Sequence, residues 1–428
     1  MARRSSILLR LTRMLSITLP LAFLVGCGSD VAIPDLPPAR ADLPPAEDFS
    51  TMRGAAIDLL FEGRVFMGAR SGFVALVAKN GRLVHASLTG HRDLEREIPM
   101  AMDTRFQIAS MTKPVIGVAA MILVEEGKLG LDDPVARYVP GVADMQVAVY
   151  DDAGEVVSTR PAETTMLVRH LMSFSSGMGP GMEPGPLMTK WREQGSYTGT
   201  GSLANRVERI RDLPLFEDPG TKWRYGNAFD VLARVVEIAA EEPLDHFLAR
   251  RIFEPLGMSA THYLKDTPAD APLAVMYKKG EAGNLEPAEQ EFRPDDWTPG
   301  GTGLVSTAPD YMRFALMLWN DGEYDGSRIL RAETVHKMRE PQIDGVLESM
   351  GRKGLSFGLG VSVVTDADAT QMSTRSDDFW WSGAYGTHLW ISPSTGIVLV
   401  VMQQQEMNAD LGDLPIAPFI AQGIALGG

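Results

Sequence analysis

Segments typical of β-strands lie near both ends of this chain, and segments typical of α-helices lie between them. The strand-like runs are residues 73–79, 82–89, 357–365, 386–391 and 397–403. Runs with apolar residues at helical spacing are residues 50–66, 110–127, 166–173, 204–212, 228–240, 244–253 and 309–320, and residues 145–160 favour a small hairpin. Asn80-Gly81, between the first two strand-like runs, is the strongest short-range signal for a two-residue hairpin. This order predicts an α/β (α+β) fold, in which both ends of the chain complete one sheet domain and a mainly helical domain is inserted.

Composition excludes several classes of protein. Hydrophobic residues make up 45% of the 428 residues and charged residues 22%, as in ordinary folded proteins. The net charge of −15 argues against a nucleic-acid partner, because contacts to phosphates need a basic face. The single cysteine rules out an intramolecular disulfide and a thiolate metal cluster. The seven histidines form no pair at metal-ligand spacing, so we expect no catalytic metal and no cofactor.

The N-terminus has the layout of a secretory signal. Four arginines precede an uncharged, mostly apolar run at residues 14–26, which at 13 residues is short for a transmembrane helix. The run ends in the sequence LVGC, which resembles the lipobox of bacterial lipoproteins and whose cysteine is Cys27. The resemblance implies that residues 1–26 are removed as a signal peptide and that Cys27 is lipidated. An ordinary signal peptide with an incidental cysteine is the alternative.

A lipid on Cys27 anchors a chain to a membrane without spanning it. No other stretch reaches 18 apolar residues, so we expect no further span. The sequence DLPPA occurs twice within residues 28–50, which favours a semi-rigid polyproline II tether. We therefore expect a protein of the bacterial cell envelope that faces the periplasm, and Gly28 favours the outer membrane over the inner one. The predicted parts are the tether at residues 27–50, the sheet domain at residues 51–114 and 290–428, and the inserted helical domain at residues 115–289.

A serine and a lysine one helical turn apart are the first candidates for chemistry. Ser110 and Lys113 stand three residues apart at the start of a predicted helix, so both side chains lie on one face. The positive end of the helix dipole favours negative charge that develops on the hydroxyl, and a neutral lysine can accept the serine proton. Ser-x-x-Lys alone is a weak signal, because it recurs by chance in most chains of this length.

Two further motifs add to this pair. In the sequence YGN, just before a predicted helix, the phenol of Tyr225 can relay a proton and the amide of Asn227 can hold Lys113 or a substrate. An N-cap role for Asn227 is the structural alternative. In the sequence WSGA, Gly383 permits close approach of the backbone, and the next amide, that of Ala384, can point into a cleft. An aromatic pair at a strand edge is the alternative there.

Together and in this order, the three motifs resemble those of the serine β-lactamase and penicillin-binding superfamily. Five longer stretches carry the same resemblance: TRFQIASMTKPV, LVRHLMSFSSGM, FEDPGTKWRYGNAFDVLARVVE, IFEPLGM and GGTGLVSTAPDYMRF. The resemblance covers roughly residues 50–428 and is closest to class C-like esterases, the family VIII carboxylesterases. It implies a β-lactamase/transpeptidase-like fold, an antiparallel sheet flanked by helices with an inserted mainly helical domain.

The resemblance also implies a role for each motif. It makes Ser110 the nucleophile of an acyl-enzyme, with Lys113 and Tyr225 sharing the general-base and general-acid work and Asn227 supporting them. It makes the backbone N–H groups of Ser110 and Ala384 the oxyanion hole. Which of Lys113 and Tyr225 takes the first proton stays open.

The third motif divides the superfamily. β-Lactamases and penicillin-binding proteins usually carry Lys-Thr-Gly or His-Thr-Gly there, and this lysine helps to hold a substrate carboxylate. Here the first position is Trp381, whose indole has one donor and no charge. We therefore expect a carboxylesterase that acts on a small-molecule ester. The alternatives are a β-lactamase, a D-Ala-D-Ala carboxypeptidase or D-amidase of the same fold, and a non-catalytic binding lipoprotein.

Other features compete with this interpretation. Gly-x-Ser-x-Gly at residues 354–358 fits an α/β-hydrolase nucleophile at Ser356 with His388 as its base, but a strand rather than a helix follows it. The glycine-rich residues 300–303 lack the lysine of a phosphate loop and predict a turn beside the cleft. Residues 177–202 predict either an active-site lid or a plain surface loop. Three tryptophans are candidates for an acyl pocket or for core packing: Trp191, Trp223 and Trp297.

Overall fold

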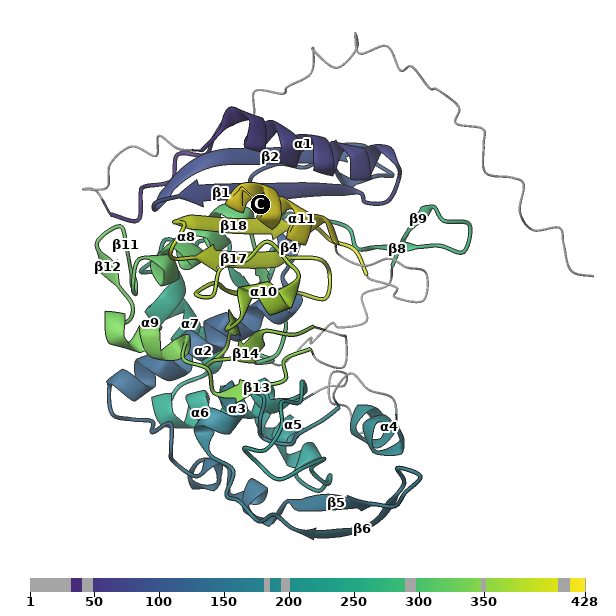
Figure 1. The fold of residues 1–428 in the computed structure, drawn as a ribbon, viewed down its shortest axis with the longest axis vertical. Helices are drawn as coiled ribbons and strands as arrows, with labels where there is room; N and C mark the ends of the chain where they lie inside the picture. The colour runs from purple at the N-terminus through teal and green to yellow at the C-terminus, as the bar shows by residue number, and fades with distance from the viewer. Residues whose placement is uncertain are drawn as a thin grey trace, which may run out of the picture. The chain divides into compact units, whose positions relative to one another are not determined.

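One antiparallel sheet joins the two ends of the chain. The computed structural model describes residues 32–40, 49–180, 185–193, 201–288, 298–347, 352–406 and 416–427. Within them, nine strands form a sheet in the order β13-β14-β15-β16-β17-β18-β1-β2-β3 (Figure 1). Their bounds are β1 Gly72–Lys79, β2 Arg82–Asp93, β3 Ile98–Pro99, β13 Ile343–Asp344, β14 Leu355–Phe357, β15 Ser362–Val364, β16 Phe379–Ser382, β17 His388–Ser392 and β18 Ile397–Met402. Val77 of β1 pairs with Leu399 of β18, so strands from both ends complete the sheet, as the sequence predicts.

The hairpin between β1 and β2 follows from two residues. Asn80 and Gly81 have φ angles of +48° and +75°, the left-handed values that a type I′ turn needs at both central positions. Lys79 and Arg82 pair directly across the turn. The N–H of Asn80 also donates to the carbonyl of Gly396 at 2.7 Å, so the turn is fixed to the C-terminal part of the sheet.

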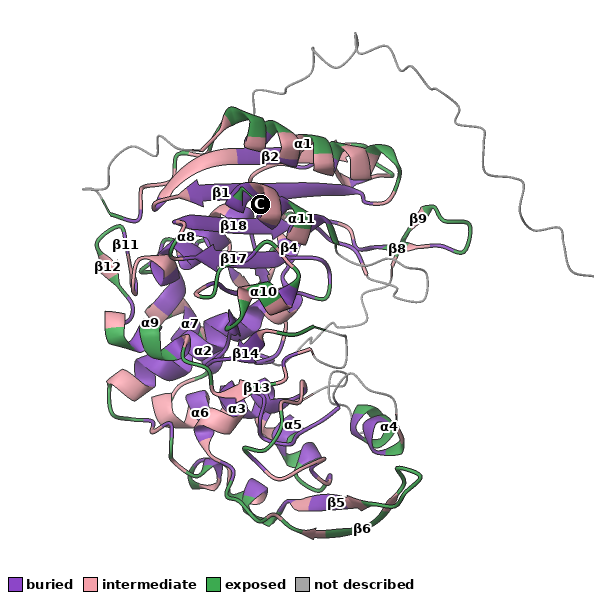
Figure 2. Ribbon diagram, viewed as in Figure 1, coloured by how far each residue is buried: buried purple, intermediate pink, exposed green. Residues whose placement is uncertain are grey.

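Helices cover both faces of the sheet at its centre. Helices α1 (Thr51–Phe66) and α11 (Ile416–Leu426) pack on each other, α1 also on β2 and α11 on β18 (Figure 1). Helix α8 (Ala308–Trp319) packs on β1, β17 and β18. All six residues of β18 are buried, as expected for a strand that is covered on both sides (Figure 2).

Helix α2 (Thr112–Glu125) is the central helix of the molecule. It is buried from Thr112 to Leu123 and packs against α6 (Ala228–Ala240). Around α6 lie α3 (Val168–Met172), α5 (Leu203–Ile210) and α7 (Leu244–Leu248), and a π-helical turn, Ala249–Phe253, continues α7. The hairpin expected at residues 145–160 is β5 (Gln146–Tyr150) with β6 (Val156–Pro161). The boundaries of the inserted domain stay a prediction.

The remaining elements are mostly too short to show a period in the sequence, and they were not predicted. They are the three-stranded sheet β4 (Phe106–Gln107), β10 (Leu304–Ser306) and β7 (His262–Tyr263), the pairs β8 (Tyr277–Lys279) with β9 (Leu285–Pro287) and β11 (Glu323–Tyr324) with β12 (Ser327–Arg328), and the helices α4 (Pro186–Glu193), α9 (Ala332–Met338) and α10 (Ala367–Thr370). Helix α11 was also missed, because its sequence is apolar on nearly every side.

The single strand predicted at residues 357–365 is wrong, since β14 ends at Phe357 and β15 begins only at Ser362. The N–H of Gly358 donates to the carbonyl of Val361 at 2.9 Å, which closes a turn between them. A Cβ atom on Gly358 would lie 2.1 Å from the carbonyl oxygen of Met338, and Gly360 has a φ of +99°. The glycines therefore mark a turn against α9, not a continuous strand.

The proline-rich segment is partly fixed to the folded body. The N–H of Ala39 donates to the carbonyl of Gly81 at 2.8 Å, and the hydroxyl of Tyr324 donates to the carbonyl of Pro37 at 2.9 Å. Residues 1–31, with the expected signal peptide and Cys27, lie outside the described residues. In the part of the chain that the structure describes, no helix is long and apolar enough to cross a membrane.

The Gly-x-Ser-x-Gly motif at residues 354–358 forms no nucleophile elbow. Ser356 is buried inside β14 and donates to the carbonyl of Ile343 at 2.8 Å, and a strand follows it. His388, on β17, lies 2.7 Å from the hydroxyl of Ser382 through its Nδ1 and packs against Trp390 and Phe419. Ser356 and His388 therefore belong to the packing of the sheet.

The burial of His388 predicts a loss of stability in acid. Burial lowers the pKa of His388 from 6.5 to about 3. As the pH falls through this interval, the unfolded chain takes up a proton that the folded chain excludes, so the free energy of unfolding falls. Between pH 7 and pH 4 this side chain is expected to contribute about 3 kcal/mol to the loss. Urea unfolding at pH 7 and at pH 4 measures this loss of unfolding free energy. The loss is expected to be smaller in His388→Asn, because that side chain takes up no proton. An equal loss in both proteins contradicts the prediction.

Candidate active site

Ser110 lies in the turn that begins α2. A 3₁₀ turn, Ala109–Met111, precedes the helix, and Ala109 has a φ of +46° although it is not a glycine. This left-handed conformation costs an alanine about 1–2 kcal/mol, so the buried surroundings must hold it in place. The turn leaves Ser110 partly accessible while Thr112 and Lys113 are buried.

The amine of Lys113 lies at the centre of the site. Its side chain is only 1% exposed. The Nζ atom donates to Ser110 Oγ at 3.0 Å, to Tyr225 Oη at 2.6 Å and to the carbonyl oxygen of Gly301 at 2.6 Å. The prediction that Ser110 and Lys113 share one face of the helix is therefore confirmed in its geometry.

Tyr225 closes a triangle with these two residues. Its Oη lies 2.6 Å from Ser110 Oγ, and its ring centroid lies 4.7 Å from Lys113 Nζ. Close backbone packing next to it fixes this position, because a Cβ atom on Gly226 would lie 2.2 Å from the carbonyl oxygen of Gly179. A proton can thus pass between any two of the three groups without movement of the backbone.

Asn227 stands at the start of α6, and its side chain contacts Asp230 in the first turn of that helix. It holds the N-cap position, but its side chain makes no capping hydrogen bond to the helix. Its Nδ2 donates to Asp230 Oδ2 at 3.1 Å.

Residues 300–303 lie beside the site, as expected, since the carbonyl of Gly301 contacts Lys113. The sequence contains no signal for this contact, because any residue type carries a carbonyl.

Trp381 lies beside the triangle within a group of aromatic rings. Its ring centroid is 5.9 Å from that of Tyr225 and 5.0 Å from that of Phe357. Phe174 lies 4.7 Å from Tyr225, and Trp223 lies 6.3 Å from it. The first position of the third motif therefore presents an uncharged aromatic ring next to Tyr225.

The turn after β16 is pressed against the backbone that precedes Ser110. A Cβ atom on Gly383 would lie 2.3 Å from the carbonyl oxygen of Ile108, so only glycine fits. Thr387 Oγ1 donates to the same carbonyl at 3.0 Å, and the N–H of Gly383 donates to the carbonyl of Thr387 at 2.8 Å. These contacts hold the segment with Ala384 next to the turn that carries Ser110.

The other candidates are either packing residues or lie outside the described residues. Trp191 is buried in α4 and donates through Nε1 to the carbonyl of Pro214 at 2.9 Å, which is core packing. Trp297 lies outside the described residues. Of the segment expected as a lid or loop, residues 181–184 and 194–200 also lie outside them, so the choice between the two stays open.

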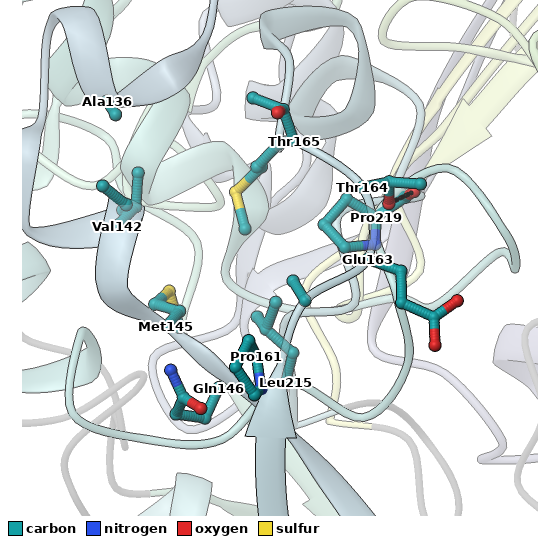
Figure 3. A pocket seen from close by; sticks show the side chains of 13 residues that line it. Ala136, Val142, Met145, Gln146, Pro161, Glu163, Thr164, Thr165, Leu215 and Pro219 are labelled. Atoms are coloured by element: carbon teal, nitrogen blue, oxygen red, sulfur yellow. Dashed lines mark hydrogen bonds between the residues drawn. The ribbon is translucent and has the colours of Figure 1, made fainter.

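A separate cavity lies near the hairpin of β5 and β6. It has a volume of about 300 Å³, and Figure 3 shows Met145, Gln146 and Leu215 among its lining residues. The residues that line it do not include Ser110, Lys113 or Tyr225.

Within the described residues, no three His, Cys, Asp or Glu side chains come together as a metal site requires.

Comparison with known proteins decides the family. The family model described as Beta-lactamase matches residues 57–417. This chain belongs to the beta-lactamase family. The match confirms both the resemblance read from the motifs and the β-lactamase/transpeptidase-like fold. With its esterase relatives, described next, the family match makes the chain a serine hydrolase of the β-lactamase-like superfamily.

Relatives of this beta-lactamase family member include named esterases. Protein Rv1367c of Mycobacterium tuberculosis is 36% identical over 355 residues, which cover 79% of this chain and 86% of that protein. Esterase EstB of Burkholderia gladioli is 26% identical, covering 85% of this chain and 93% of EstB. The solved structure of EstCE1, a hydrolase with promiscuous acyltransferase activity, matches with a TM-score of 0.75 and 26% identity, over 88% of this chain and 99% of that chain.

The packing of Gly383 predicts its effect on turnover. A methyl group on residue 383 must push the β16–β17 turn, and Ala384 with it, away from Ile108 and Ser110. Loss of one oxyanion donor typically lowers kcat by about 10²–10³, so Gly383→Ala is expected to lose this much in p-nitrophenyl butyrate hydrolysis. Gly63→Ala is the control, since a Cβ atom there meets no atom within 4 Å. Wild-type kcat in Gly383→Ala contradicts the role of this turn.

Proposed function

We propose that this protein is a carboxylesterase that hydrolyses small or medium-sized esters through an acyl-enzyme on Ser110. The observation that carries the proposal is the triangle of Ser110 Oγ, Lys113 Nζ and Tyr225 Oη, whose three edges are 3.0, 2.6 and 2.6 Å. A serine hydroxyl in contact with both a buried amine and a phenol has two routes by which to lose its proton.

Acylation is the first step. Ser110 Oγ attacks the carbonyl carbon of the ester, forms a C–O bond and passes its proton to Lys113 or Tyr225. The carbonyl oxygen becomes an oxyanion, which the N–H groups of Ser110 and Ala384 stabilise. When the tetrahedral intermediate collapses, the bond to the alcohol oxygen breaks and Tyr225 returns a proton to the leaving alcohol.

Deacylation repeats these steps with water. A water molecule loses a proton to the same pair of groups and attacks the acyl carbon. The bond from that carbon to Ser110 Oγ breaks, and the serine regains its proton as the carboxylic acid leaves. Both half-reactions use the same oxyanion site, because their tetrahedral intermediates have the same charge distribution.

Trp381 supports an ester substrate over a β-lactam or a D-Ala-D-Ala peptide. The ring stands next to Tyr225, and an indole supplies no charge to pair with a substrate carboxylate. Trp223 is partly exposed beside Tyr225 and offers an apolar ring that suits an acyl chain, while the buried rings of Phe174 and Phe357 pack behind Tyr225 and Trp381. The esterase named among the relatives points the same way.

Acyl transfer to an alcohol is the second candidate. The acyl-enzyme formed on Ser110 can pass its acyl group to an alcohol in place of water by the same deacylation step. The promiscuous acyltransferase activity of the structural neighbour EstCE1 favours this possibility. Hydrolysis alone in the presence of added alcohol counts against it.

We further propose that the protein acts in the bacterial cell envelope, facing the periplasm, with its membrane contact limited to a lipid on Cys27. The sequence LVGC after a positively charged start and an apolar run supports this location. Gly28 favours the outer membrane over the inner one. Incorporation of a fatty-acid analogue that is lost in Cys27→Ser tests the anchor.

A paired assay tests the proposed function. p-Nitrophenyl butyrate and nitrocefin are supplied to the wild type and to Ser110→Ala. We expect ester turnover that falls by several orders of magnitude in the variant, and little nitrocefin turnover, because Trp381 offers no charge for the β-lactam carboxylate. Nitrocefin turnover as fast as ester turnover overturns the esterase assignment. No turnover of either substrate favours the peptidase or the binding lipoprotein.

A further inference from the structure

The third hydrogen bond of Lys113 leads to a group whose position must itself be fixed. Lys113 Nζ donates to the carbonyl oxygen of Gly301 at 2.6 Å, and Gly301 lies 188 positions further along the chain. The other two contacts of the amine are the reacting groups Ser110 and Tyr225. The Gly301 carbonyl is therefore the contact that holds the amine in place from outside the triangle. Glycines leave a backbone unusually free, so something else must hold the Gly300-Gly301 pair.

The carboxylate of Asp230 holds that pair. Its Oδ1 accepts hydrogen bonds from the N–H of Gly300 at 2.9 Å and from the N–H of Gly301 at 3.0 Å. The backbone packs closely at the same place, since a Cβ atom on Gly300 would lie 1.9 Å from the carbonyl oxygen of Phe229. The two glycines are thus clamped to the first turn of α6, with the N–H of Gly301 bound on one side and its carbonyl presented to Lys113 on the other.

The second oxygen of Asp230 is also bound. Oδ2 accepts from Asn227 Nδ2 at 3.1 Å and lies 3.7 Å from Arg206 Nε. Asp230 is 2% exposed and Arg206 is 1% exposed, so the pair is buried and screened little by solvent. Three hydrogen bonds and this ion pair leave the carboxylate one orientation.

The carboxylate also lies close to the amine itself. A Cβ atom on Gly301 would lie 3.5 Å from Asp230 Oδ1 and 3.5 Å from Lys113 Nζ, so the two atoms are at most about 7 Å apart. An acidic residue in the first turn of a helix commonly just stabilises the helix dipole. Here both oxygens are used outside that role, on two glycines, an amide and an arginine.

We propose that Asp230 is a positioning residue for acyl transfer. It fixes the amides of Gly300 and Gly301, so that the Gly301 carbonyl holds the Lys113 amine against Ser110 and Tyr225. It touches no substrate, and this role rests on the proposed function of Ser110 as nucleophile. Without Asp230, the amine loses its fixed acceptor and the serine loses reactivity.

The test compares Asp230 with a matched carboxylate. Asp310 is also buried in the first turn of a helix, α8, where it accepts from the N–H of Ala260 at 2.8 Å and from Thr261 Oγ1 at 3.0 Å. Asp230→Asn, Asp230→Ala and Asp310→Asn are made in the full chain. Three quantities are measured for each variant: the rate at which a fluorophosphonate labels Ser110, and kcat and KM for p-nitrophenyl butyrate, with kcat normalised to the amount of enzyme that the fluorophosphonate can label.

A positioning role makes specific demands on these rates. A misplacement of about 1 Å at a reacting group can cost about 10² in rate, so Asp230→Ala is expected to lose about 100-fold in labelling rate and in kcat. Asp230→Asn keeps one acceptor oxygen and is expected to lose about tenfold. KM is expected to change less than about twofold, because the substrate pocket is intact. Asp310→Asn is expected to melt at a lower temperature but to label at the wild-type rate.

Other outcomes overturn the proposal. Wild-type labelling in folded Asp230→Ala does so, as does an equal loss in Asp310→Asn. If the Asp230 variants fail to fold, Gly300→Ala replaces them, because it displaces the turn from α6 and keeps the buried pair of Asp230 and Arg206. Wild-type labelling in that variant is then the contradicting result. Labelling needs no ester substrate, so a wild type that labels but hydrolyses no ester defeats the proposed function alone.

Discussion

The site depends on one buried amine. Lys113 is 1% exposed, and removal of an amine from water is unfavourable unless hydrogen bonds replace those to the solvent. Ser110, Tyr225 and Gly301 supply these bonds from three separate segments of the chain. The hydrogen bonds that compensate for burial of the amine therefore also place it beside Ser110 and Tyr225, as nucleophilic catalysis requires.

The fold brings these segments together through the central helix and the sheet. The segment that runs into helix α2 carries Ser110 and Lys113, and α6, packed against that helix, carries Asp230 and begins just after Tyr225. The sheet contributes β16 and its following turn, which Gly383 allows to approach the backbone before Ser110. Because β1 pairs with β18, both ends of the chain must be in place before the sheet that carries β16 and its following turn is complete. The site is thus a property of the complete fold.

The sequence predicted those features that a residue type or a period reveals. The spacing of Ser110 and Lys113 predicted their shared face, and Asn80-Gly81 predicted its hairpin. The proximity of Tyr225 and Trp381 came only from the resemblance, since no local rule joins residues more than 100 positions apart. The contact of the Gly301 carbonyl with Lys113 could not be predicted from the sequence, because every residue has a backbone carbonyl. The strand expected at residues 357–365 was wrong because the packing of Gly358 on α9 outweighs the apolar pattern.

The central claim is that Ser110 is the nucleophile, activated by Lys113 and Tyr225. Labelling with a fluorophosphonate, followed by peptide mapping, tests it without any assumption about the substrate. We predict one modified residue, Ser110, with a labelling rate that falls by several orders of magnitude in Lys113→Ala. Modification of another serine, such as Ser356 or Ser382, or undiminished labelling in Lys113→Ala, would contradict the account.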